Sequence, residues 1–322
     1  MIHIFQYLTN DLSTLSRCSR VSKLFERCAS PILWYHLRLH PSIDQPDPYL
    51  INSTQRIRRF LDPSSSMKEK LKQVKILTVH HHSSHWCRPD KFPSIFLPNL
   101  ITLNIQVDEE FYNHFHDRTR TPAPTSNSSC PLLLELKPKN LILRIHGFER
   151  VIYGYGGIPL GIFDKVDNVF LIPRVGIGYM AYFDPYEGLS RSPPSRIKSI
   201  TIIYKVIPDY TSSAQESMKQ RRKGNRYAKL QKMVEDLGDS EISLIIVLQR
   251  YLSEGVEEEM QQAINIHLDG LPEKFWSQEK KEKRKKMVGV LSLQRWVAER
   301  WRWEDRFDED EVWGWEDEGG IL

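Results

Sequence analysis

The residue types best suited to metal chemistry lie in one short stretch, His80-His81-His82 with His85 and Cys87. Imidazole nitrogen and thiolate sulfur are donors that zinc prefers, and a zinc site needs about four ligands that converge on one point. Consecutive histidines on an extended chain point to opposite faces, and no second ligand pair stands nearby in the sequence. The stretch therefore predicts a solvated loop after a strand, and no metal ligand is assigned.

Other patterns typical of catalysis or cofactor binding are incomplete. The glycine-rich run Tyr153–Gly161 has the composition of a phosphate-binding loop, but Pro159 interrupts it and no Lys-Ser or Lys-Thr pair follows. The sequence has no Gly-x-Ser-x-Gly elbow. Its carboxylate clusters, Asp236–Glu241 and Glu257–Glu259, have the spacing of solvated helix faces. No catalytic residue and no cofactor are predicted, and a hydrolase-type enzyme that uses the His80–Cys87 region remains an alternative.

Composition and charge describe an ordinary globular chain. Its 322 residues are 40% hydrophobic and 27% charged, with a formal net charge of +4, and a chain of this length can bury a core. No apolar run approaches the roughly 20 residues that cross a bilayer, and the first residues lack the pattern of a signal peptide. The 4 cysteines show no paired spacing, which favours free thiols. We expect a cytoplasmic or nuclear protein that does not contact a membrane.

Two basic clusters, Lys219–Lys223 and Lys280–Lys286, are candidates for nuclear import or nucleic-acid binding. The acidic segment Glu304–Glu318 follows the second cluster, and the net charge is small. Charge blocks of this kind usually form exposed helix surface. Nucleic acid is therefore not an expected partner.

The N-terminal residues are dense in apolar positions at helical spacing, which predicts several short helices. The apolar side of a first helix falls within Ile4–Leu8, and Thr9-Asn10-Asp11 can cap the next helix. The apolar positions that follow are Leu12, Leu15, Cys18, Val21, Leu24, Phe25 and Cys28. Ser30-Pro31 opens a further predicted helix, with Trp34 and Leu37 one turn apart. A compact helical module of this kind is suited to binding rather than to catalysis.

Three segments of this module resemble elements of the F-box family: Ile4-Phe5-Gln6-Tyr7-Leu8, Val21-Ser22-Lys23-Leu24-Phe25 and Pro31-Ile32-Leu33-Trp34. Their order and spacing agree with the family pattern. The Leu-Pro opening of that pattern is missing, so either the true start lies further upstream or the module binds its adaptor less tightly.

The F-box resemblance implies a non-catalytic substrate receptor of a cullin-type ubiquitin ligase. Its partners would be a Skp-type adaptor, the cullin complex that the adaptor joins, and a target protein that the sequence does not identify. The apolar adaptor contacts implied by the resemblance are Phe5, Leu8, Leu15, Val21, Trp34 and Leu37. Some of these side chains will instead hold the module together.

The remaining chain predicts an α/β domain in which short β-branched runs alternate with polar connections. The predicted strands are Val74–Val79, Leu100–Val107, Leu141–His146, Asn168–Ile172, Ile197–Val206, Ile242–Leu248 and Ala263–Leu268. Their irregular recurrence predicts either a leucine-rich-repeat-like array or an open parallel sheet. A repeat-type protein-interaction scaffold unrelated to ubiquitination therefore remains an alternative.

These patterns set the predicted domain boundaries. The F-box-like helical module occupies residues 1–40, a helical connection 41–73, and the repeat-like α/β domain 74–270, with loops at 119–131 and 190–195. From Met287 onward apolar residues keep helical spacing, which predicts a capping helix within 271–303 and an acidic tail over 304–322. The tryptophans of that helix are expected to seal the open core.

Overall fold

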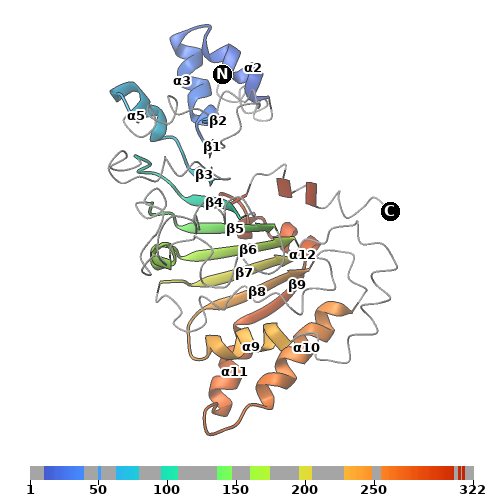
Figure 1. The fold of residues 1–322 in the computed structure, drawn as a ribbon. Coiled ribbons are helices and arrows are strands. Elements are labelled where there is room, and N and C mark those ends of the chain that lie inside the picture. The colour runs from blue at the N-terminus through green and yellow to red at the C-terminus, as the bar shows by residue number, and fades with distance from the viewer. Residues whose placement is uncertain are drawn as a thin grey trace, which may run out of the picture. The chain divides into compact units, whose positions relative to one another are not determined.

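The fold is that of a computed structural model, which describes residues 11–39, 50–51, 63–79, 96–107, 136–146, 160–174, 196–204, 228–248, 255–307, 311–312 and 314–315. The chain divides into two compact units, whose helices and strands are labelled in Figure 1. The first contains the N-terminal helices and strands β1 to β4, and the second contains strands β5 to β9 with helices α9 to α12. Helices at the N-terminus followed by parallel strands and further helices confirm the predicted α/β class.

The first unit joins a helix pair to a short parallel sheet. Its elements are α2 (Leu12–Ser19), α3 (Lys23–Leu33), β1 (His36–Leu39), β2 (Leu50–Ile51), α5 (Ser65–Leu71), β3 (Ile76–Val79) and β4 (Thr102–Val107). The strands lie in the order β2-β1-β3-β4, and every neighbouring pair is parallel. Leu37, Leu77 and Leu103 are aligned by this register and are buried. A slip by one residue would turn this apolar row to the other face, so burial sets the register.

The second unit is a parallel sheet whose strands follow one another in chain order. Its elements are β5 (Asn140–His146), β6 (Asn168–Arg174), β7 (Ser199–Tyr204), α9 (Ala228–Leu237), β8 (Ser243–Leu248), α10 (Val256–Asp269), α11 (Gln278–Lys286), β9 (Val288–Ser292), α12 (Leu293–Ala298) and the 3-10 helix η4 (Arg300–Arg302). Another 3-10 helix, η2 (Leu160–Lys165), precedes β6. Each strand pairs in parallel with the next. Right-handed crossovers between strands in this order place the described connecting helices α9, α10 and α11 on one face of the sheet, so the opposite face needs another cover.

The C-terminal segment provides that cover. We call Leu293–Phe307 together with residues 311, 312, 314 and 315 the strap, and the sheet face beneath it the strap face. One apolar cluster joins them. The sheet contributes Ile142, Phe170, Ile172, Ile203, Val247 and Leu291, and the strap contributes Leu293, Trp296, Val297, Trp303, Phe307, Val312 and Trp315. Because these sheet residues come from every strand between β5 and β9, the strap crosses the full width of this unit's sheet.

A row of polar side chains lies at the start of the strands on the strap face. The side-chain amide of Asn168 donates to the Asn140 side-chain oxygen at 2.8 Å, and the Ser199 hydroxyl donates to the Asn168 side-chain oxygen at 2.7 Å. The parallel register aligns these residues with Ser243 on β8. Buried polar groups of this kind stabilise a fold only when they are paired, and here neighbouring strands satisfy one another.

The predicted strand Ala263–Leu268 is wrong, because these residues belong to the helix α10. Met260, Ile264 and Leu268 are buried and stand four residues apart, which is the spacing of one helix face. The two-residue alternation seen within Ala263–Leu268 is short enough to fit both periods. Only the longer range that begins at Met260 distinguishes the helical period from the strand period.

The predicted single capping helix that runs from Met287 through Trp303 is also wrong. Residues 288–292 form strand β9, which pairs with β8 in register and ends this unit's sheet, and α12 begins only at Leu293. Val288, Val290 and Leu291 are all buried, so side chains on both faces of this strand are covered. The expectation that tryptophans cover the core agrees with Trp296 and Trp303, which are 1% and 2% exposed.

Helix α11 contains the second basic cluster, and most of its cations pair within the unit. Lys281 is 3% exposed and donates to the carbonyl oxygens of Asp269 and Leu271. Arg284 is 1% exposed and donates to the carbonyl oxygens of Ser240 and Ile242. The further ion pairs are Lys280 with Asp239, Lys283 with Glu241, and Lys285 with Asp269 and Glu282. The cluster therefore joins the end of α10 to the connection between α9 and β8, and Lys219–Lys223 lies outside the described residues.

Candidate protein-interaction site

The helix pair α2–α3 is defined by side-chain caps at both helix starts. A side-chain oxygen of Asp11 accepts from the backbone N–H of Thr14 at 2.8 Å, and the Ser22 hydroxyl accepts from that of Phe25 at 3.2 Å. Each cap satisfies an N–H group that has no partner inside its helix. Hydrogen bonds from Thr14, first from its side chain, lower the pKa of Asp11. The first cap is therefore ionised at neutral pH.

A small apolar core holds the two helices together. Its buried members are Leu15 on α2 and Ala29 and Leu33 on α3. Partly buried side chains surround them: Leu12, Cys18, Phe25, Cys28, Ile32 and Trp34. Lys70 of α5 adds an ion pair with Glu26 at 3.2 Å, and its ammonium group lies 5.9 Å from the centre of the Trp34 ring. These contacts fix the helix pair against α5 within the first unit.

The prediction that Ser30-Pro31 opens a further helix is wrong. Helix α3 continues through Pro31 to Leu33, and Trp34 is its C-cap. Leu37 then lies in β1, opposite Leu77, instead of one helical turn beyond Trp34. The carbonyl oxygen of Tyr35 accepts from the backbone N–H groups of Lys75 and Ile76 at 2.9 and 3.1 Å. These hydrogen bonds join the chain to β3 directly after Trp34, so helix α3 ends there and β1 begins at His36.

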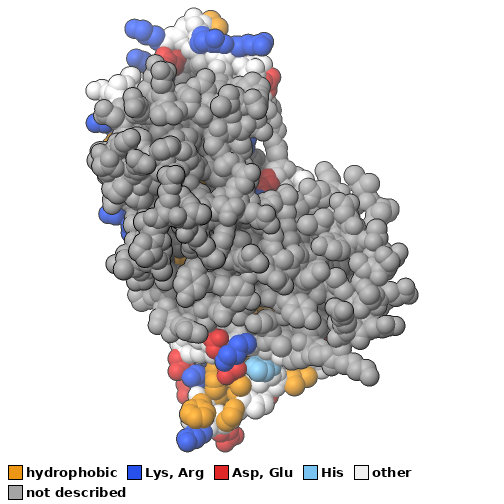
Figure 2. All heavy atoms as spheres, viewed as in Figure 1, with side chains coloured by type: hydrophobic (Ala, Val, Ile, Leu, Met, Phe, Trp, Pro, Cys, Tyr) orange, Lys and Arg blue, Asp and Glu red, His pale blue; other side chains and the backbone are white. Residues whose placement is uncertain are grey.

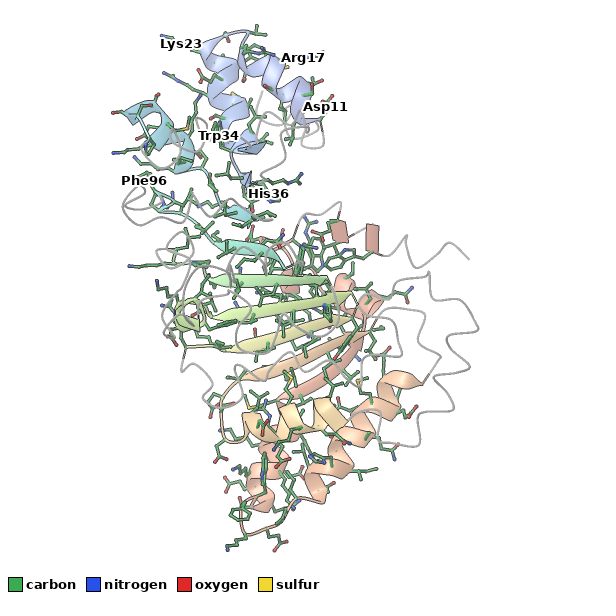
Figure 3. All side chains as sticks on the ribbon, viewed as in Figure 1. Asp11, Arg17, Lys23, Trp34, His36 and Phe96 are labelled. Carbon is green, nitrogen blue, oxygen red and sulfur yellow. The ribbon has the colours of Figure 1, made fainter. Side chains whose placement is uncertain are left out.

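The turn between α2 and α3 exposes apolar side chains. Val21 is 71% exposed and Leu24 is 52% exposed, although both belong to the apolar pattern of the sequence. Four exposed cations lie around them in the chain: Arg17, Arg20, Lys23 and Arg27. Figure 2 shows blue side chains with apolar atoms among them at this end of the helix pair, and Figure 3 places Arg17 and Lys23 at the end away from Trp34. We call Val21, Leu24 and these cations the α2–α3 tip.

The predicted adaptor contacts fall into different environments. Phe5 and Leu8 lie outside the described residues. Val21 is at the tip and open to a partner, and Trp34 is half-buried at the other end of the helix pair. The two remaining residues, Leu15 and Leu37, are 0% and 2% exposed, so they hold the unit together.

Sequence reasoning missed Leu24 as an exposed contact. The apolar pattern of the sequence groups Leu24 with Val21 and Phe25, but of these three side chains only Phe25 packs against the core of the helix pair. The available signal was the cap at Ser22, which places Leu24 in the first turn of α3. In a short helix pair, the residues of the connecting turn lie at the end of the shared core, where less apolar surface is covered.

Neither of the two sequence stretches considered for metal or phosphate binding can be placed beside this surface. The stretch His80–Cys87 lies outside the described residues, as does Tyr153–Gly161 apart from its final two residues. Among the residues that are described, no group of three or more His, Cys, Asp or Glu side chains is placed to hold a metal ion. In the same part of the chain, no helix combines the length and the apolar character that a membrane span needs.

Comparison with known proteins identifies the helical module. The family model described as F-box-like matches residues 1–40, the range that contains α2, α3 and the α2–α3 tip. Comparisons with curated proteins and with solved structures give no significant match. Residues 1–40 of this chain are therefore an F-box-like domain.

Proposed function

We propose that the chain is a non-catalytic substrate receptor of a cullin-type ubiquitin ligase, which links a Skp-type adaptor to a target protein. The observation that carries this proposal is the F-box-like match over residues 1–40, because domains of this family generally act as adaptors in such ligases. The receptor holds its target near a reactive group supplied by other subunits, and proximity alone can accelerate such a transfer. A cytoplasmic or nuclear location fits this role.

The proposed adaptor contact is centred on the α2–α3 tip. Val21 and Leu24 are large apolar side chains with more than half of their surface exposed, and a partner that covers them gains the free energy of apolar burial. Phe5, Leu8 and Trp34 are further proposed contacts from the family resemblance. Leu15 and Leu37 support the surface from inside the fold.

Co-purification of the full chain with a recombinant Skp-type adaptor tests this function. The wild-type chain should bind, and the double substitution Val21→Asp with Leu24→Asp should weaken binding at least about tenfold, or roughly 1.4 kcal/mol. The matched control is Ile266→Asp, because Ile266 is 63% exposed on α10 in the second unit. A wild-type chain that fails to bind, or a double variant that binds as the wild type does, would contradict the proposal.

A repeat-type scaffold unrelated to ubiquitination is the second candidate. It is favoured by the parallel strands that follow chain order from β5 to β9, since repeat proteins stack successive units in this way. The leucine-rich-repeat-like interpretation stays a prediction, because the strands start at the unevenly spaced residues 140, 168, 199, 243 and 288. A folded chain that captures other proteins but no Skp-type adaptor would favour the scaffold.

A further inference from the structure

A bidentate ion pair joins one end of the strap to the sheet. The two terminal nitrogens of the Arg144 guanidinium on β5 donate to the two carboxylate oxygens of Glu311, the second at 2.7 Å. The side chains are 15% and 28% exposed, so the pair is largely shielded from water. An arginine fork that meets a carboxylate in this way recognises both the charge and its orientation. We call Glu311, Val312, Gly314 and Trp315 the strap end.

Two apolar side chains of the strap end also pack against the sheet and the rest of the strap. Val312 is 0% exposed and Trp315 is 4% exposed, and both belong to the cluster on the strap face. The Trp315 ring stacks on Trp296, with ring centres 6.1 Å apart, and meets the Phe307 ring edge to face at 5.3 Å. The site therefore accepts a carboxylate, an aliphatic side chain one residue later and an aromatic ring three residues after that.

The part of the strap before the strap end is held independently. Helix α12 follows β9 directly, which places Trp296 and Val297 on the cluster next to the sheet. The Trp303 indole N–H donates to the Val297 carbonyl oxygen at 2.7 Å, and the Phe307 ring meets Phe170 edge to face at 5.3 Å. Release of the strap end would therefore leave these contacts in place. Proteins open locally where few buried contacts hold a segment.

We propose that the strap end occupies a binding site for target peptides of the same chemistry. A target segment with an acidic residue, an aliphatic residue directly after it and an aromatic residue three positions further would displace the strap end. Its carboxylate would pair with Arg144, and its apolar side chains would take the places of Val312 and Trp315. The site lies within the second unit, and its role as a target site rests on the proposed receptor function.

Peptide binding in trans tests this site. A fluorescein-labelled peptide with the sequence of residues 308–318, DEDEVWGWEDE, is titrated with the full chain and with a chain that ends after Phe307. The peptide should bind the shortened chain at least ten times more tightly than the full chain. Its variants Glu311→Lys and Trp315→Ser should each lose most of that binding. A folded shortened chain that binds none of these peptides, or binds all three equally, overturns the proposal.

A second variant keeps the test decisive where the shortened chain does not fold. Glu311→Arg in the full chain places two guanidinium groups together, so it should release the strap end and raise affinity for the wild-type peptide at least tenfold. The matched control is Glu304→Arg, which changes the charge of an exposed strap residue that pairs with Arg300 and should leave the affinity unchanged. Equal peptide affinity of Glu311→Arg and wild type would overturn the proposal.

Adaptor binding is measured separately on the same proteins. A chain that binds the peptide but no Skp-type adaptor keeps the peptide site and loses the receptor function. If the chain binds the adaptor but Glu311→Arg gains no peptide affinity, the receptor function is supported and the peptide site is contradicted. The two proposals therefore fail in different measurements.

Discussion

The ammonium group of Lys281 donates to the carbonyl oxygen of Leu271 at 2.7 Å, although the sequence around Lys281 is that of an exposed basic run. A second hydrogen bond reaches the carbonyl oxygen of Asp269 at 2.9 Å. These carbonyl groups lie at the end of α10, where the helix leaves acceptors without partners of its own. A cation placed there satisfies both acceptors and also opposes the negative end of the helix dipole. The buried lysine is thus a structural cap.

Replacing Lys281 with methionine should destabilise the second unit. The substitution removes two part-buried hydrogen bonds from the ammonium group to the carbonyl oxygens of Asp269 and Leu271, and a hydrogen bond to a charged group contributes about 1.5–3 kcal/mol. We expect the free energy of unfolding to fall by about 2–4 kcal/mol, measured by urea denaturation. Lys286→Met, on the exposed side of α11, should change it by less than about 0.5 kcal/mol. Equal effects of the two substitutions would contradict the capping role.

The strands of this fold were largely predictable because their signal is local. Asn140–His146, Asn168–Arg174 and Ser243–Leu248 are short β-branched runs, and each of these three strands begins within two residues of its predicted start. Strands β1, β2 and β9 were not predicted. A strand with buried residues on one or both faces leaves this pattern in its own sequence. The α/β class and the parallel sheet follow directly from such runs.

What the sequence could not predict depends on contacts between distant residues. Arg144 and Glu311 are 167 residues apart, and nothing local marks either as a partner of the other. In the same way, the burial of Lys281 and Arg284 depends on carbonyl groups of other segments. At the α2–α3 tip, the resemblance predicted Val21, but the exposure of Leu24 depends on where the shared helix core ends. Pattern and propensity carry no such information.

Truncation of a tryptophan in the strap should lower the free energy of unfolding strongly where the ring is buried and only slightly where it is exposed. Trp296 is 1% exposed and contacts both Phe307 and Trp315, so Trp296→Ala should lower the free energy of unfolding by about 3–5 kcal/mol. Trp301 is 65% exposed, and Trp301→Ala should cost less than about 1 kcal/mol. Thermal and urea unfolding, followed by circular dichroism, measure both. A small effect of Trp296→Ala would mean that the strap contributes little to the stability of this unit.

Two apolar residues of the helix pair should have different roles. Leu15 should contribute to stability, and Val21 should contribute to adaptor binding. Leu15 is 0% exposed, so Leu15→Ala should destabilise the first unit by about 2–5 kcal/mol. Val21 is 71% exposed, so Val21→Ala should leave stability within about 0.5 kcal/mol of wild type while it weakens adaptor binding. Urea denaturation and adaptor titration on the same two variants measure these effects. A loss of stability in Val21→Ala would place that side chain in the core.

The carboxyl group of Asp167, just before β6, should make stability depend on pH in the acid range. Burial of the side chain acts to raise its pKa, but a hydrogen bond from Arg196 at 3.1 Å and the charge of Lys198 at 3.6 Å outweigh burial and lower it. The folded pKa therefore lies below the unfolded value of about 3.9. Under this condition the ionised group stabilises the fold above the unfolded pKa, and the contribution is lost as pH falls through the folded pKa.

Urea unfolding of wild type and Asp167→Asn at pH values from 7 to about 2 measures this contribution. The wild type should be the more stable protein at pH 7, and the difference should shrink steadily below pH of about 4. Arg196→Gln removes the charged guanidinium donor, so it should bring the folded pKa closer to the unfolded value and weaken the same pH dependence. A stability difference between wild type and Asp167→Asn that stays constant over the whole range would mean that the carboxyl group acts by packing rather than by charge.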